Sequence, residues 1–223
     1  MKINQILDQL KALSDKSTLT YNTKHGVGEN QFGVKLGDIR KIAKDIKSDH
    51  PLALELWKTE NFDARMLATL ILKPKELTAT ELDALVRSVK YARVSDWLNS
   101  YVVKIHPDNE TLRQQWMTDN DPMALRSGWY LTTLRVENNP EMVDVPSLLN
   151  RIENEMGVAS PDAQWTMNFC LAAIGINHPN YRKRAIEIGE KLGVYRDYPV
   201  SKGCVSPFAP VWINEMVKRQ QAT

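Results

Sequence analysis

Residues 63–70 read DARMLATL, and their pattern returns twice further along the chain. Residues 121–131 read DPMALRSGWYL, and residues 160–171 read SPDAQWTMNFCL. Each stretch follows a break, with an acid or a proline where a helix would begin. When the three are aligned, a long polar side chain precedes a stripe of small and apolar residues in each: Arg65, Arg126 and Gln164. We therefore predict a degenerate repeat of helix pairs, since neighbouring pairs in such repeats bury one another's apolar faces.

Helical periodicity extends outward from these stretches over most of the chain, and alternating strand patterns are nearly absent. Residues 36–47 carry an apolar stripe, and residues 78–89 open with the capping pattern TATE. We predict an all-α fold, an α-α superhelix of HEAT-like helix pairs forming a curved solenoid. It would make one domain over residues 1–223, with an irregular segment at 193–209 and a final helix. Further helices are expected near residues 2–13, 51–58, 62–72, 95–105, 109–118, 122–136, 141–156, 161–176, 179–192 and 210–220.

Composition narrows the class of protein without naming a partner. The 223 residues are 43% hydrophobic and 25% charged, with a net charge of +2, so any basic face must come from local clustering. The two cysteines, Cys170 and Cys204, cannot build a disulfide framework, and neither has a second ligand at metal-binding spacing. We expect no metal and no cofactor. No apolar run approaches the roughly 18 residues that span a bilayer, so we expect a cytoplasmic protein that makes no membrane contact.

Basic side chains crowd two regions where they could meet phosphates. Six lie near the N-terminus, and five more fall at the starts or ends of successive helices. If the solenoid aligns them, they form a stripe suited to DNA, since phosphate contacts dominate sequence-independent affinity. An ordinary solvated surface with interleaved acids explains the spacing equally well. The residues are Lys24, Lys35, Arg40, Lys41, Lys44 and Lys47, then Arg65, Arg87, Lys90, Arg93 and Arg126.

An aromatic helix face offers a second kind of contact. Trp97, Tyr101 and Lys104 stand at i, i+4 and i+7, with Asp96 and Ser100 beside them. An aromatic face can hold a sugar or stack on a cationic base. The alternative is that these rings fill gaps between helices, which remains open for Trp97 because its neighbours are polar.

These features together resemble the DNA alkylation repair family, the AlkD-like glycosylases built from HEAT-like helix pairs. The likeness rests on GVKLGDIRKIAK at 33–44, on Leu56-Trp57 followed by Asp63-Ala64-Arg65, and on Ser95-Asp96-Trp97. Arg126 opens a later repeat helix in the same way. The likeness runs from about residue 20 to 192, and the order and spacing of these motifs are more specific than any one of them. Residues 202–208 lie outside it.

The resemblance implies removal of cationic N3- or N7-alkylated purines from duplex DNA, with the DNA backbone gripped and the lesion left stacked. Such purines are good leaving groups, so the site need only stabilise an oxocarbenium-like sugar with a carboxylate and tryptophan faces. By resemblance, Trp97 takes the position of the sugar-contacting Trp, Arg126 that of a backbone-clamping Arg, and Phe169 that of a second Trp. The family's catalytic Asp position is Tyr101 here, and a phenol cannot supply the anionic stabilisation. Asp96 is the alternative carboxylate, although its side chain points about 100° away from Trp97 on a helix.

Two functional hypotheses therefore stay open. In the first, the chain is a divergent DNA alkylation repair protein that binds alkylated or distorted double-stranded DNA and excises bases weakly or by altered chemistry. In the second, it is a HEAT-repeat scaffold that binds DNA or protein without catalysis. The candidate catalytic residues are Trp97, Tyr101, Asp96 and Phe169. The candidate DNA-binding residues are Lys24, Lys35, Arg40, Lys41, Lys44, Arg65 and Arg126.

Overall fold

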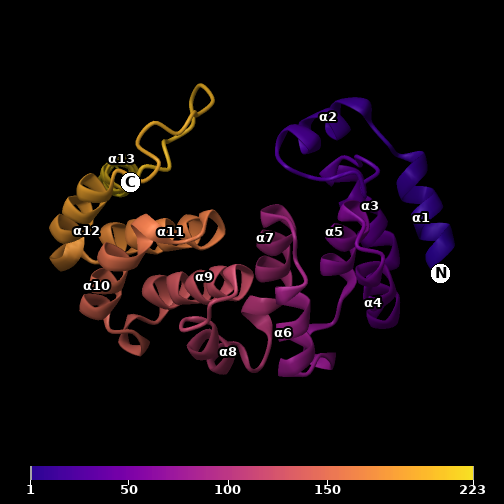
Figure 1. The fold of residues 1–223 in the computed structure, drawn as a ribbon, viewed down its shortest axis with the longest axis horizontal. Helices are drawn as coiled ribbons and strands as arrows, with labels where there is room; N and C mark the ends of the chain where they lie inside the picture. The colour runs from indigo at the N-terminus through magenta and orange to yellow at the C-terminus, as the bar shows by residue number, and fades with distance from the viewer. Residues whose placement is uncertain (1, 223) are drawn as a thin grey trace. The chain divides into compact units, whose positions relative to one another are not determined.

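The structure is a computed structural model that describes residues 2–222, and over that range the chain is all-α, as predicted (Figure 1). The α-helices are α1 (Ile3–Ala12), α2 (Lys16–Lys24), α3 (Leu36–Ile46), α4 (His50–Lys58), α5 (Phe62–Ile71), α6 (Ala79–Arg87), α7 (Ala92–Tyr101), α8 (Asn109–Trp116), α9 (Pro122–Asn138), α10 (Val145–Glu155), α11 (Pro161–Asn177), α12 (Pro179–Leu192) and α13 (Ala209–Gln221). Short 3-10 turns cover Pro74–Glu76 (η1), Val103–Ile105 (η2), Pro140–Met142 (η3) and Met156–Val158 (η4). None of the helices within residues 2–222 is long and apolar enough to cross a membrane.

The helices gather into two compact units. Asn109 closes the first, which holds α1 to α7, and Glu110 opens the second, which holds most of α8 and α9 to α13. Whether the two units fold as the one domain expected from the sequence stays a prediction.

The three repeated stretches begin helices because each has its own cap. Asn61 accepts a hydrogen bond from a backbone N–H in the first turn of α5, and Asp121 and Ser160 do the same for α9 and α11. Pro122 and Pro161 occupy the first helical position, where the missing N–H costs nothing. The starts of these helices are therefore local properties of the sequence.

The aligned polar residues of the repeat fasten neighbouring helices together. Arg65 Nε donates to the carbonyl of Trp57 at 3.1 Å, and Gln164 Nε2 donates to the carbonyl of Met156 at 2.9 Å. In both cases the acceptor lies eight residues earlier, near the end of the preceding α-helix. Arg126 donates to a backbone carbonyl of α11. Hydrogen bonds from these side chains to backbone carbonyls therefore hold the repeated helices in place, together with the contacts between apolar stripes.

In the first unit, α5 is the central helix. Its residues are buried from Phe62 to Thr69, and α3, α4 and α7 all pack against it (Figure 1). This central position explains why α5 carries no clean amphipathic pattern, since it is surrounded on several sides.

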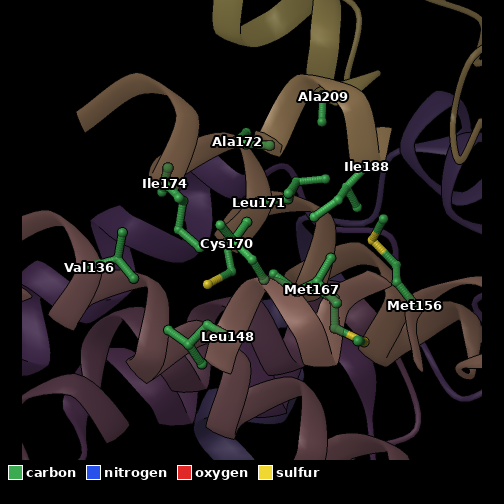
Figure 2. Packing of buried hydrophobic residues seen from close by; sticks show 14 of the residues in the cluster. Val136, Leu148, Met156, Met167, Cys170, Leu171, Ala172, Ile174, Ile188 and Ala209 are labelled. Atoms are coloured by element: carbon green, nitrogen blue, oxygen red, sulfur yellow. The ribbon is translucent and has the colours of Figure 1, made fainter. Parts of the chain in front are cut away.

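In the second unit, α11 has the corresponding role. Figure 2 shows Met167, Cys170 and Leu171 of this helix among apolar side chains that include Leu148 of α10 and Ile188 of α12. Burial raises the pKa of the Cys170 thiol to about 12. The final helix α13 approaches closely because Gly189 has no side chain, as a Cβ there would lie 2.6 Å from Cδ of Pro210.

The observed helices differ from the predicted ones at three places. Helix α2 was not predicted, because its nine residues are mostly polar and lack an apolar stripe, although Asp15 caps it through the N–H of Thr18. Helix α7 begins at Ala92 rather than at 95 and ends at Tyr101, where η2 follows. Helix α10 begins at Val145 rather than at 141, because Asp144 is its cap.

Candidate nucleic-acid interface

The earlier start of α7 brings three long side chains onto one helix face. Arg93, Trp97 and Tyr101 stand at i, i+4 and i+8. The rings of Trp97 and Tyr101 meet edge to face, with centroids 5.6 Å apart. Trp97 is only 9% exposed, whereas Tyr101 is 39% exposed. The face therefore presents a phenol to solvent beside a largely covered indole.

The group that covers Trp97 is a guanidinium from another helix. The Cζ atom of Arg40, on α3, lies 4.7 Å from the centroid of the Trp97 ring, which is a cation–π contact. Arg40 is exposed and forms no ion pair within residues 2–222. One turn further along α3, the exposed Lys44 also forms no ion pair in that range. Two uncompensated cations thus stand on the face of α3 that adjoins Trp97.

A second cation–aromatic pair lies at the start of α7. The Cζ atom of Arg93 is 5.3 Å from the Tyr21 ring on α2, and Arg93 Nη2 donates to the Tyr21 hydroxyl at 3.4 Å. Tyr21 is 48% exposed and stacks on His25, with centroids 4.0 Å apart. Lys24 is exposed at the end of the same helix, one turn after Tyr21. We call Tyr21, Arg40, Arg93, Trp97 and Tyr101 the cation–aromatic strip.

Two of the predicted lysines are engaged by acids. Lys35 Nζ lies 3.0 Å from Oδ2 of Asp15, and Lys41 Nζ lies 2.9 Å from Oδ1 of Asp38. The hydrogen bond to Asp38 raises the pKa of Lys41. Hydrogen bonds from Ser17, the Thr18 backbone and Lys35 hold the pKa of Asp15 below its usual range. These lysines are therefore less available to phosphates than Arg40, Lys44 and Lys24.

Arg65 lies inside the first unit instead of on its surface. Its side chain is 4% exposed and stacks on Trp57 at 4.9 Å. Besides its bond to Trp57, its Nη1 donates to the carbonyl of Ser88 at 2.8 Å. Burial lowers the pKa of Arg65, and the nearby Glu60 opposes this shift. The guanidinium serves two carbonyls and so has a structural role, and its expected phosphate contact stays a prediction.

Arg126 has a similar structural role in the second unit, and its expected phosphate contact also stays a prediction. Its side chain is 2% exposed, and Nη1 donates to the carbonyl of Asp162 at 2.8 Å. The Asp162 carboxylate lies 3.8 Å from the same nitrogen. The side chain predicted to clamp the DNA backbone thus ties α9 to the first turn of α11.

Phe169 belongs to an aromatic cluster of the second unit. Its ring lies 5.3 Å from that of Trp165 and 4.6 Å from that of Trp212. Tyr195 and Tyr198, from the segment after α12, also contact Trp165, at 5.2 and 5.8 Å. Burial raises the pKa of Tyr195 to about 12. Phe169 is therefore packed between neighbouring rings, and Tyr198, at 46% exposed, is the outermost one.

The chemistry around Trp97 favours anions over cations. Tyr101 occupies the position at which the resemblance places a carboxylate, and Arg40 adds a positive charge above the indole. Asp96 is exposed, one residue before Trp97, and so projects from a different side of α7. Within residues 2–222, no group of three His, Cys, Asp or Glu side chains could hold a metal ion.

The sequence reasoning missed Tyr21 and left Arg93 out of the site. The signal for Arg93 was its position four residues before Trp97, which the predicted helix start at 95 concealed. The signal for Tyr21 was the capping pattern Asp15-x-x-Thr18, which indicates a helix start before a polar segment.

Comparisons with known proteins identify the family and the fold of the chain. The family model described as DNA alkylation repair enzyme matches residues 6–198. An uncharacterised protein of Listeria innocua is 24% identical over 222 residues, and one of Listeria monocytogenes is 22% identical over 222 residues. Each alignment covers 97% of this chain and 97% of the relative.

A solved structure has the same fold. It represents a new family of proteins related to the HEAT-like repeat DNA glycosylases with affinity for branched DNA structures. The TM-score is 0.81 at 23% identity, and the match covers 99% of this chain and 95% of that one. The predicted HEAT-like fold and the family resemblance are therefore confirmed. The chain belongs to the DNA alkylation repair enzyme family.

Proposed function

We propose that the protein binds branched or distorted DNA through the cation–aromatic strip, Lys24 and Lys44, and does not break the glycosidic bond. The observation that carries this proposal is the guanidinium of Arg40 on the ring of Trp97. The family membership supports DNA as the partner, and the positive charge beside Trp97 supports binding without excision.

The two arginines of the strip are suited to phosphates. A guanidinium presents its N–H groups in one plane, matches phosphate geometry and stacks on aromatic faces. Stacking on Trp97 and Tyr21 limits the rotamers of Arg40 and Arg93 before any DNA arrives, so less side-chain entropy is lost on binding. Neither side chain forms an ion pair within the described residues, so no ion pair has to be broken when a phosphate binds.

The same guanidinium opposes base excision. Excision needs a cationic sugar near Trp97, and Arg40 already places a positive charge 4.7 Å from that ring. A positive charge at this ring repels a sugar cation that develops beside it and so raises the barrier to excision. Tyr101 offers no charge to offset it, so the site lacks both the attraction and the neutrality that the reaction requires.

The preference for branched DNA rests on two supports. The structurally similar protein family is described as having affinity for branched DNA structures. In addition, Tyr21 and Tyr101 expose aromatic rings beside the cations, and unstacked bases at a branch point can stack on such rings. A regular duplex keeps its bases stacked and offers only its phosphates.

A binding titration tests the proposal. A four-way junction and a linear duplex of the same sequence content are titrated with the wild-type protein and with the Arg40→Glu/Lys44→Glu variant. We expect the junction to bind more tightly than the duplex, and the variant to lose most of the affinity for both. The matched control is Lys58→Glu/Lys75→Glu, which makes the same charge change at two exposed lysines outside the strip and should retain binding.

The claim of no excision has its own measurement. The protein is incubated with N7-methylated duplex DNA, and abasic sites are counted against the spontaneous rate. We expect no excess. Excess product that disappears in Trp97→Ala or Asp96→Asn would overturn this part of the proposal, and absence of binding to any DNA would favour a protein-binding scaffold.

A further inference from the structure

A pocket of about 390 Å³ opens beside the cation–aromatic strip. Its lining includes Val34 and Phe62, each 1% exposed, which form its deep end, and Leu36 at the start of α3. Tyr21 and Arg93, the second cation–aromatic pair, also line it. The volume lies within the range of about 300–1,000 Å³ typical of small-ligand sites. The pocket thus combines apolar side chains, an aromatic ring and one cation with the polar side chains of Ser17, Thr18 and Asn22.

The pocket is built on a rigid turn. The buried carboxylate of Asp63 accepts hydrogen bonds from the backbone N–H groups of Phe32, Gly33 and Val34, at 2.6, 3.0 and 3.0 Å. Gly33 has a φ of 74°, a conformation that favours glycine. Three bonds to one carboxylate fix the chain that delivers Val34 and then α3. The pocket is therefore formed before any ligand binds, which lowers the entropy lost on binding.

The charge at the pocket is positive at Arg93. The guanidinium stacks on the Tyr21 ring, donates to its hydroxyl and forms no ion pair within residues 2–222. None of the residues that line the pocket is acidic, and Asp15, which caps the helix that carries Ser17 and Thr18, is already bound by Lys35 at 3.0 Å. An anionic ligand thus meets one available cation and no unpaired acid.

We propose that this pocket takes one unpaired nucleobase of the bound DNA, with Arg93 on the adjoining phosphate. The proposal rests on the DNA binding proposed above and names the part of a branched or bulged DNA that is recognised. A base matches the apolar interior and the Tyr21 ring, because every base has a face that stacks on an aromatic side chain. The phosphate matches the guanidinium, and Arg93 joins the pocket to the strip because it lies one turn before Trp97 on α7.

The test compares two bulged duplexes that differ only in one base. Each carries a single unpaired nucleotide, which is adenine in one and an abasic tetrahydrofuran residue in the other. Stacking one base on an aromatic residue predicts that the adenine bulge binds about fivefold more tightly or better. Ser17→Met places a flexible apolar chain at the exposed edge of the pocket and should bring that ratio close to one.

Two further variants separate the contributions. Thr20→Met makes a similar change on the same helix outside the pocket lining and should keep the ratio. Arg93→Gln should lower the affinity for both DNAs to a similar extent, because both retain the phosphate that Arg93 contacts in the proposal. Unchanged unfolding temperatures show that the variants are folded.

The outcomes distinguish the two proposals. Equal affinity for the two bulges in the wild type overturns the base pocket and leaves DNA binding intact. A ratio that persists in Ser17→Met also overturns it, since the base would then be read elsewhere. Failure to bind either bulge overturns both proposals.

Discussion

Replacing Arg40 and Lys44 by glutamine removes two cations from the face of α3 beside Trp97, and neither is neutralised by an acid within residues 2–222. Each phosphate that a protein neutralises adds about 0.9 to the slope of log affinity against log salt concentration. The double variant should therefore lower the slope by about 1.8. Between about 50 and 200 mM salt, the wild type would then lose about twelvefold more affinity than the variant.

The assay is fluorescence anisotropy of a labelled four-way junction over a series of salt concentrations. The matched control is Lys35→Gln/Lys41→Gln, which removes the same charge from lysines that are paired with Asp15 and Asp38. We expect less than half the change in slope for the control. The reasoning is refuted if both variants change the slope equally, or if Arg40→Gln/Lys44→Gln leaves it unchanged.

Three further predictions concern groups away from the strip. Arg65→Gln removes the hydrogen bonds to the carbonyls of Trp57 and Ser88. The free energy of unfolding in urea should therefore fall by about 3 kcal/mol. Unchanged stability would contradict the structural role of Arg65. Hydrogen bonds from Arg113 lower the pKa of Glu110 from 4.5 to about 2, so the charged pair stabilises the fold above pH 4.5 and is lost as the pH falls toward 2. Glu110→Gln should cost about 1 kcal/mol at pH 7 after solvent screening and progressively less as the pH falls through 2, and a cost independent of pH would count against this. The Cys170 thiol, with its pKa raised to about 12, should resist a thiol reagent at pH 8 until the protein unfolds, whereas the exposed Cys204 reacts at once; equal rates for the two would show that Cys170 is accessible.

The sequence predicted the repeat because its signals are local. Caps, first-turn prolines and apolar stripes depend on residues within one or two turns, and Thr78 with Glu81 forms the capping box that the TATE pattern indicates. The alignment of Arg65, Arg126 and Gln164 was also meaningful. The sequence did not show that the two arginines bind carbonyls, because a charged side chain at a helix start does not reveal which carbonyl it will reach in another segment.

The candidate site was predicted only in part because it depends on contacts between distant segments. Arg40 and Trp97 are 57 positions apart, and Arg93 and Tyr21 are 72 apart. No periodic pattern relates such residues. The pocket is harder still to predict from the sequence, because it depends on hydrogen bonds from the backbone of residues 32–34 to Asp63, which lies on α5. The basic segment at 36–47 and Trp97 were predictable, whereas their pairing was a product of the fold.

Photocrosslinking identifies the residues that touch DNA and so tests whether the cation–aromatic strip binds it. A four-way junction carrying 5-bromodeoxyuridine at its branch point is irradiated with the wild-type protein, and the adducts are mapped by mass spectrometry. The account predicts adducts on the aromatic members of the cation–aromatic strip, which are Tyr21, Trp97 and Tyr101. Adducts found only after Glu110, such as on Trp165 or Tyr198 of the second unit, would contradict it.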